Sequence, residues 1–367
     1  MTVNIPPIVE TLSTILFALA VLHTFVVKKF AELAHRAREG SIKENILHFL
    51  SEVEVVFGLW AAVLLFVWAI FIEDGDAVVH YLDSLNFTEP AFVFVIMCVS
   101  ATKPIMQLAR AAMGALARMI PINRGVARYV VTLVVGPLLG SAITEPAAMT
   151  VTALLLKSDL YEQQVSTRLK YITLGLLFVN ISVGGTLTHF AAPPILMVAR
   201  PWGWDTPFVF TAFGERAIVY IVLATILTAI LFRNELTSLS HTGSNNEERA
   251  AKSPWWLTMS HLICIFLVVR YSHHMTFFIS LFLLFLGWTE VTKEHQEELR
   301  LRQSMLVAFF LGGLVTLGHL QGWWLQPLIT ELNERTLFWG ATALTSVTDN
   351  AAITYLGTLV TNLSDPA

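Results

Sequence analysis

Long apolar stretches are the feature of this sequence that most limits how it can fold. In the hydrocarbon core of a bilayer every backbone N–H and C=O must find a partner within the protein, so such stretches fold as helices. The chain is 55% hydrophobic and 14% charged, whereas a soluble domain has about 25% charged residues. We therefore expect an all-α polytopic membrane protein whose partner is the lipid bilayer, with no nucleic acid bound. The predicted apolar stretches are residues 8–27, 46–72, 91–108, 130–156, 171–198, 217–232, 255–269, 275–291, 305–324 and 337–363.

One short motif occurs twice inside these stretches, with an offset of 204 residues between Glu145 and Asp349. Each copy places a carboxylate beside a proline or an asparagine in otherwise apolar sequence. A carboxylate is costly in lipid, so two in matched positions indicate a functional site. Interrupted apolar segments in corresponding positions of two halves point to the binding site of a transporter. The copies read TEPAAMT at 144–150 and TDNAAIT at 348–354.

Lysine and arginine residues set the predicted orientation, because they gather in cytoplasmic loops. Residues 130–156 either cross the membrane or enter and return as a hairpin. With a hairpin and an external N-terminus, 18 of the 23 basic residues are cytoplasmic, four are external and Lys103 lies within a span. If residues 130–156 cross instead, 13 basic residues are cytoplasmic and nine are external. The charges favour the hairpin, in a multi-pass protein of the inner (cytoplasmic) membrane.

The orientation inferred from the basic residues also predicts inverted-topology repeats, each with a re-entrant hairpin. Residues 1–200 form the first repeat, with the hairpin at 130–156 and an interrupted span at 171–198. Residues 201–254 are a linker span and a cytoplasmic loop, and residues 255–367 form the second repeat, with its hairpin at 337–363. The two tips then meet near the midplane from opposite faces. The counterpart of Gly184 would fall at 184 + 204 = 388, beyond Ala367, so the second repeat is expected to be C-terminally incomplete.

Both tips carry oxygen atoms of the kind that hard cations prefer. The alternative for each hydroxyl is a hydrogen bond to its own helix. The predicted ion and proton ligands at the tips, with the helix-breaking Pro146, are Ser141, Thr144 and Glu145 in the first copy, and Ser346, Thr348, Asp349 and Asn350 in the second.

The third predicted element is a break within residues 180–194. Gly184 and Gly185 precede Pro193 and Pro194 inside one apolar segment, which favours an unwound centre between two half-helices over a kinked span. Lys103, before Pro104, is either a displaceable counter-ion of Glu145 or a side chain that snorkels to the headgroups. The break also contains three further candidate ion and proton ligands, Asn180, Thr186 and Thr188.

At these motifs the chain resembles the ion transporter superfamily, and within it the putative sodium/proton antiporter family, which is related to arsenite permeases and dicarboxylate/sodium symporters. The resemblance implies that hairpin tips and interrupted spans enclose one central ion site. Asp349-Asn350 is similar to the Asp-Asn of sodium/proton antiporters, and Glu145-Pro146 matches that pattern loosely. The dicarboxylate branch has Ser-Asn-Thr at its tips, with no carboxylate there.

The leading hypothesis is a secondary Na+/H+ antiporter and not an enzyme. Na+ and H+ compete for Glu145 and Asp349, and alternating access turns this competition into exchange. No cofactor is expected besides the transported Na+ and H+. The alternative is an anion or metalloid carrier of the same superfamily, which would need cationic residues at the tips.

A remote alternative is an intramembrane hydrolase using Ser141 and His189. Leu139 stands two residues before Ser141, so the G-x-S of a nucleophile elbow is absent. The sequence leaves open which ion is carried, the stoichiometry and the oligomeric state, a homodimer included.

Overall fold

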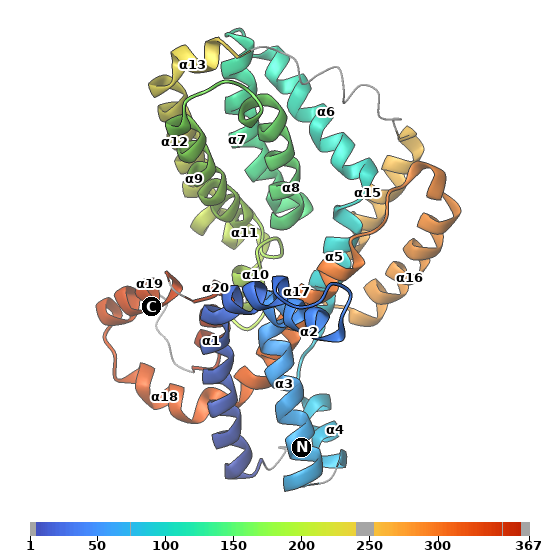
Figure 1. Cartoon of the computed structure of the whole chain (residues 1–367), viewed down its shortest axis with the longest axis vertical. Coiled ribbons are helices and arrows are strands. Elements are labelled where there is room, and N and C mark those ends of the chain that lie inside the picture. The colour runs from blue at the N-terminus through green and yellow to red at the C-terminus, as the bar shows by residue number, and fades with distance from the viewer. Residues whose placement is uncertain (1–4, 74, 240–252, 347, 361–367) are drawn as a thin grey trace. The chain divides into compact units, whose positions relative to one another are not determined.

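The computed structural model describes residues 5–73, 75–239, 253–346 and 348–360, and every regular element in these ranges is helical (Figure 1). Within these ranges six helical segments are long and apolar enough to cross a membrane. A seventh candidate is a pair of helices, α4 (Gly75–Ser84) and α5 (Thr88–Ser100), bent by 70°. The predicted all-α polytopic membrane protein is confirmed.

The helices pack into two compact units, which we describe separately. The first unit comprises the described residues up to Phe94 and those from Arg302 onward; the second runs from Val95 to Leu301. The predicted repeats divide the chain elsewhere and stay a prediction. Besides α4, α5 and most of α17 (Leu301–Gly318), the first unit contains α1 (Pro7–His35), α2 (Ile42–Ser51), η1 (Val53–Val55), α3 (Val56–Val67), η2 (Trp68–Ile72), η7 (His319–Gln321), α18 (Gly322–Thr330), α19 (Glu334–Thr345) and α20 (Asn350–Thr358).

The second unit begins within α5 and continues through an almost unbroken series of helices. Its elements are α6 (Lys103–Met119), α7 (Arg124–Ile143), α8 (Glu145–Leu156), η3 (Lys157–Tyr161), α9 (Thr167–Gly184), η4 (Gly185–Leu187), α10 (Pro193–Ala199), α11 (Thr206–Val209), η5 (Phe210–Gly214), α12 (Glu215–Leu231), α13 (Arg233–Thr237), α15 (Trp255–Arg270), α16 (Met275–Val291) and η6 (Lys293–His295).

In the first unit α3 and α17 cross with their backbones in contact. A Cβ added to Gly313 would overlap the backbone of Gly58, so only glycine permits this approach. The rings of Phe57 and Phe310 pack edge to face beside the crossing, with centroids 5.2 Å apart. α20 rests on α17 through Tyr355, whose ring covers Gly318 and whose hydroxyl donates to the Val315 carbonyl at 3.4 Å. This contact positions the second predicted tip.

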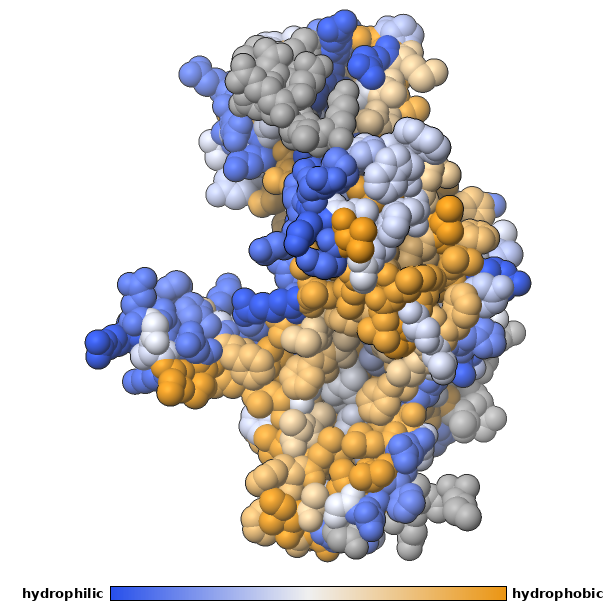
Figure 2. All heavy atoms as spheres, turned by 90° about the vertical axis from the view of Figure 1, so that its right-hand side faces the viewer, coloured by the Kyte–Doolittle hydropathy of each residue, from blue (hydrophilic) through white to orange (hydrophobic). Residues whose placement is uncertain are grey.

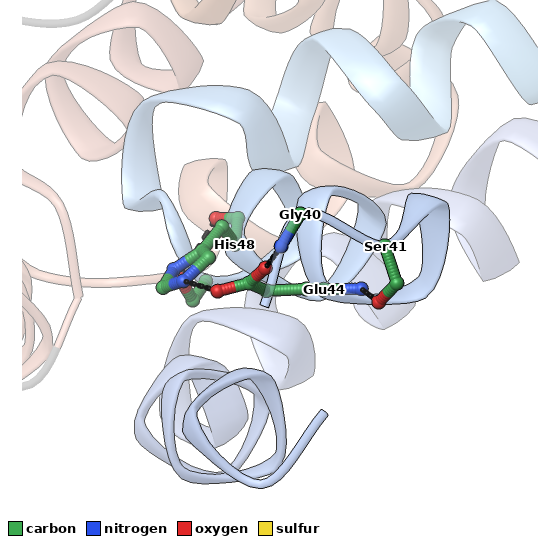
Figure 3. A network of polar contacts seen from close by, with 5 residues as sticks. Gly40, Ser41, Glu44 and His48 are labelled. Carbon is green, nitrogen blue, oxygen red and sulfur yellow. Dashed lines mark hydrogen bonds and ion pairs between the residues drawn. The ribbon is translucent and has the colours of Figure 1, made fainter. Parts of the chain in front are cut away.

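A capping box fixes the start of α2 in the basic loop after α1 (Figure 3). Ser41 Oγ accepts a hydrogen bond from the Glu44 N–H at 3.2 Å, and Glu44 Oε2 accepts one from the Gly40 N–H at 2.6 Å. The other carboxylate oxygen lies 3.7 Å from His48 Nε2. The first contact satisfies an N–H that the helix start leaves without a partner, and the second holds the residue before the N-cap against the first turn, so the chain turns sharply from α1 into α2.

In the second unit α7 is the central helix and packs against α6, α8, α9, α12 and α13 (Figure 1). α7 and α8 lie side by side, joined at Thr144. Arg128 in α7 and Asp159 in η3 form an ion pair at 3.0 Å, which ties the outer ends of the two helices together. Residues 124–161 therefore fold back on themselves; whether this hairpin is re-entrant stays a prediction.

Three predicted stretches differ from the observed helices. Residues 46–72 are split, because α2 ends at Ser51 and Glu52 is extended (φ −80°, ψ 120°) before η1. The stretch 91–108 is not one helix: α5 ends at Ser100 and α6 begins at Lys103, with Thr102 extended between them (φ −82°, ψ 153°). Pro104 explains the break, because its ring disfavours helix before it and it donates no N–H. α7 begins at Arg124, six residues before the apolar stretch, because Asn123 Oδ1 caps the helix at the Gly125 N–H (2.9 Å).

Apolar side chains are exposed along many of these helices. Phe266 in α15, Leu284 in α16 and Ile230 in α12 are 65%, 71% and 65% exposed, and Figure 2 shows hydrophobic residues gathered over much of one face. Water would penalise so much apolar surface, whereas lipid does not. The surface is therefore that of a membrane protein.

Candidate functional site

The tip of the α7–α8 hairpin is a strained turn at Thr144. Its φ of 73° and ψ of 151° lie in a region that is nearly reserved for glycine, at a cost of about 1–3 kcal/mol. Among the described residues Thr144 is the one non-glycine residue with positive φ. α8 begins directly afterwards at Glu145, with Pro146 in its first turn, where an N–H is not needed. The strained turn places a hydroxyl next to a carboxylate.

Ser141 attaches this tip to the break after α9. Its hydroxyl donates to the Gly184 carbonyl at 2.6 Å and accepts from the Leu187 N–H at 3.0 Å. Its own carbonyl accepts from Thr188 Oγ1 at 2.8 Å. Ser141 is buried, and the three bonds satisfy groups freed at the ends of both α9 and α7. The predicted break is present, and Ser141 and Thr188 hold it against the tip.

Glu145 is half-buried and lies over this break. Its Oε2 is 3.6 Å from the point where a Cβ on Gly185 would sit, and Ala192 Cβ is 3.1 Å from the same point. A Cβ at position 185 would be in ordinary contact with the carboxylate but tight against Ala192, so glycine lets the start of α10 pack closely on the break. α7 and α9 end here with partial negative charge on their last carbonyls, while α8 and α10 begin here with partial positive charge at their N-termini. The carboxylate and hydroxyl oxygens are the ligands that favour a hard cation.

Asn180, a predicted ion ligand, makes structural hydrogen bonds that were not predicted. Pro137 has no N–H, so the Leu133 carbonyl loses its helical donor. Asn180 Nδ2 donates to that carbonyl at 2.8 Å and to Thr225 Oγ1 at 3.0 Å. Asn180 Oδ1 is buried without a hydrogen-bond partner in the described part of the chain, and its role as a ligand stays a prediction.

We expect Asn180→Leu to destabilise the protein by about 1–3 kcal/mol, because the buried Leu133 carbonyl loses its donor. Pro137→Ala restores a backbone N–H at the position that serves this carbonyl. The double variant should therefore lose about 1 kcal/mol less than the sum of the single variants. Thermal unfolding of all four proteins in detergent measures the coupling, and additive losses would contradict this role of Asn180.

The second predicted tip lies between α19 and α20 in the other unit. Asp349 caps α20, with Oδ1 accepting from the Ala352 N–H at 3.1 Å. The hydroxyls of Ser346 and Thr348 donate to carbonyls of their own helix at 2.6 and 2.7 Å. Asp349 and Asn350 are exposed. Residue 347 and residues 361–363 of the predicted hairpin lie outside the described residues, and the meeting of the two tips stays a prediction.

Three other predicted residues lie near helix ends. Thr186 donates to the Val183 carbonyl at 2.7 Å, within its own helical turn, and Pro193 begins α10. Lys103 begins α6, and its Nζ is 3.8 Å from Glu297 Oε1; its pairing with Glu145 stays a prediction. Within the described ranges no three His, Cys, Asp or Glu side chains are grouped as metal ligands.

Sequence reasoning missed the break between α5 and α6. Ser100, at the end of α5, places its Oγ 3.4 Å from Thr144 Oγ1 at the first tip. Thr102, within the break, bonds His261. The signal was available, because Ser100-Ala101-Thr102-Lys103-Pro104 is a polar interruption that ends in proline inside an apolar stretch.

Comparison with known proteins identifies one family. The sequence model of the family described as "Putative Na+/H+ antiporter" matches residues 8–367. No protein of curated function matches the chain.

Proposed function

Since the chain belongs to the putative Na+/H+ antiporter family, we propose that it exchanges Na+ for H+ across the cytoplasmic membrane, with Glu145 as one shared carboxylate and Asp349 as the other. Membership of this family makes the chain a multi-pass membrane transporter. The observation that carries the choice of Glu145 is its position: a half-buried carboxylate at a strained tip, against an unwound span.

The proposed mechanism uses one site for two ions. In the cation-loaded form the Glu145 carboxylate and neighbouring oxygens bind Na+; in the proton-loaded form Glu145 is neutral. Only these two neutralised forms move between the faces, because an unpaired carboxylate is costly in lipid. Exchange follows, since loading one ion requires release of the other.

The charge of the site argues against the anion or metalloid alternative, because a carboxylate at each tip repels an anion. The hydrolase alternative loses its nucleophile. The Ser141 hydroxyl already donates to Gly184 and accepts from Leu187, and His189 Nδ1 lies 2.6 Å from Thr206 Oγ1.

The proposed orientation places the N-terminus outside and most basic loops in the cytoplasm. The Arg128–Asp159 ion pair supports it in part, because it holds the two ends of the first hairpin on one side.

The test of the function is a cation panel on the purified chain in proteoliposomes that contain a pH-sensitive dye. With an inwardly acidic gradient, NaCl added outside should drive protons out, whereas choline chloride should not. LiCl and KCl in parallel define the ion. A response to every cation equal to that of choline would overturn the proposal.

A further inference from the structure

The break between α5 and α6 reaches the first hairpin tip within one compact unit. α5 ends at Ser100, and the extended Thr102 precedes α6. The last carbonyls of α5 have lost their helical donors, so this end of the helix carries partial negative charge. Like the ends of α7 and α9, it is a favourable neighbour for a cation.

Ser100 and Thr144 form an under-satisfied pair of hydroxyls. Their oxygen atoms lie 3.4 Å apart, and in the described part of the chain this is the one hydrogen bond that either hydroxyl makes. The residues are 0% and 3% exposed. A hydroxyl can donate one bond and accept two, so the pair keeps one O–H and three lone pairs without a protein partner.

Some hydroxyls donate to carbonyls four residues earlier in their own helices, as Thr228 in α12 and Thr316 in α17 do at 2.9 and 2.8 Å. The Ser100–Thr144 pair does not, and on α8 the buried Thr152 Oγ1 likewise has no hydrogen-bond partner in the described part of the chain. The unused lone pairs of the Ser100 and Thr144 hydroxyls are available to a ligand. The residue after Thr144 is Glu145, so those lone pairs lie at the tip that carries the carboxylate.

A buried polar network holds the break in place. Thr102 Oγ1 donates to the Val99 carbonyl at 3.1 Å and lies 2.8 Å from His261 Nδ1 on α15. His261 Nε2 lies 3.0 Å from Gln296 Nε2. Because the threonine proton is used by Val99, the histidine Nδ1–H donates to Thr102 and its Nε2 accepts from Gln296. His261 is fully buried, so the network ties the break to α15.

We propose that the α5–α6 break forms a further wall of the cation site: the Ser100 hydroxyl oxygen is a direct ligand of the cation bound by Glu145, and Thr102, through His261, is a positioning residue. This inference rests on the proposed function. The bound ion is a monovalent hard cation, Na+, and the unused lone pairs of the hydroxyl pair coordinate it.

Na+ binding to the purified full chain in detergent tests the proposal without requiring transport. The readout is the thermal unfolding midpoint during an NaCl titration, with choline chloride keeping the ionic strength constant, because a ligand stabilises the folded form according to its concentration over Kd. Ser100→Ala should weaken Na+ binding about fivefold to tenfold, as expected for one lost polar contact. Ser100→Cys, which keeps the shape but replaces oxygen by soft sulfur, should do the same.

The control is Ser158→Ala at the other end of the hairpin, where the hydroxyl donates to Leu155 in its own helix; it should bind Na+ as the unmodified chain does. Thr102→Val should weaken binding, and Thr102→Ser, which keeps the hydroxyl, should restore it. If Ser100→Ala and Ser100→Cys both bind Na+ normally, the inference is wrong while the proposed function stands. If the unmodified chain is not stabilised by Na+, both are overturned.

Discussion

Replacing Glu145 by Gln is expected to abolish sodium-driven proton movement. The substitution keeps the size of the side chain but removes the negative charge and the titrating group. At an effective dielectric of about 20, a unit charge 4 Å from a cation contributes about 4 kcal/mol, which corresponds to roughly a thousandfold in affinity. The neutral amide also cannot take up the proton that exchange requires.

The measurement is dye-reported proton flux in proteoliposomes, with equal amounts of folded protein. The matched control is Glu162→Gln, which changes an exposed carboxylate paired with Lys157 at 3.9 Å near the outer end of the same hairpin. The control should exchange normally. Full exchange by the Glu145→Gln protein would show that this carboxylate is not part of the site.

Asp349→Asn should abolish exchange for the same reason if the second tip supplies the other shared carboxylate. Glu334→Gln, which removes an exposed carboxylate in the first turn of α19, is the control. If Asp349→Asn retains exchange and Glu145→Gln loses it, only the first tip supplies a carboxylate to the site.

Gly184→Ala is expected to cause the largest loss of stability. A Cβ at this position would overlap the Pro137 backbone carbonyl, and backbone within a packed helix cannot move aside as a flexible side chain can. Overpacking of this kind costs about 1–3 kcal/mol or more. It would also pull the Gly184 carbonyl from Ser141 and separate the break from the tip that carries Glu145.

Gly175→Ala is the matched control, because Gly175 lies in the same helix with nothing within 4 Å of an added Cβ. That variant should gain about 0.5–1 kcal/mol, since alanine is the better helix former. The two substitutions should therefore shift the unfolding midpoint in detergent in opposite directions. Equal shifts would contradict the close packing of α9 on α7.

The parts of the fold that the sequence predicted are those with local causes. Hydrocarbon permits only helices in long apolar stretches, which determined the class of protein. The break after Gly184 and Gly185 was predictable because two glycines and two prolines within one apolar segment cannot continue a helix. Thr144, Glu145 and Ser141 were chosen as candidate ligands because polar groups are rare in such surroundings, and their role stays a prediction.

The parts that escaped prediction depend on contacts distant in sequence. Nothing near Asn180 indicates that its amide serves the carbonyl freed by Pro137, because Leu133 is 47 residues away. Ser100 and Thr144 are separated by 44 residues, so their pairing exists only in the folded unit. The start of α7 was missed because a polar cap at Asn123 and a basic first turn extend the helix beyond its apolar stretch.

The central claim, that Na+ and H+ share one carboxylate site, is tested most directly by Na+ binding to the purified chain at a series of pH values. One-for-one competition predicts that Na+ affinity falls about tenfold for each pH unit below the pKa of the shared carboxylate, and that Na+ releases protons into a weakly buffered solution. Glu145→Gln should remove both effects. Na+ binding of equal affinity at every pH, with no proton released, would contradict the account.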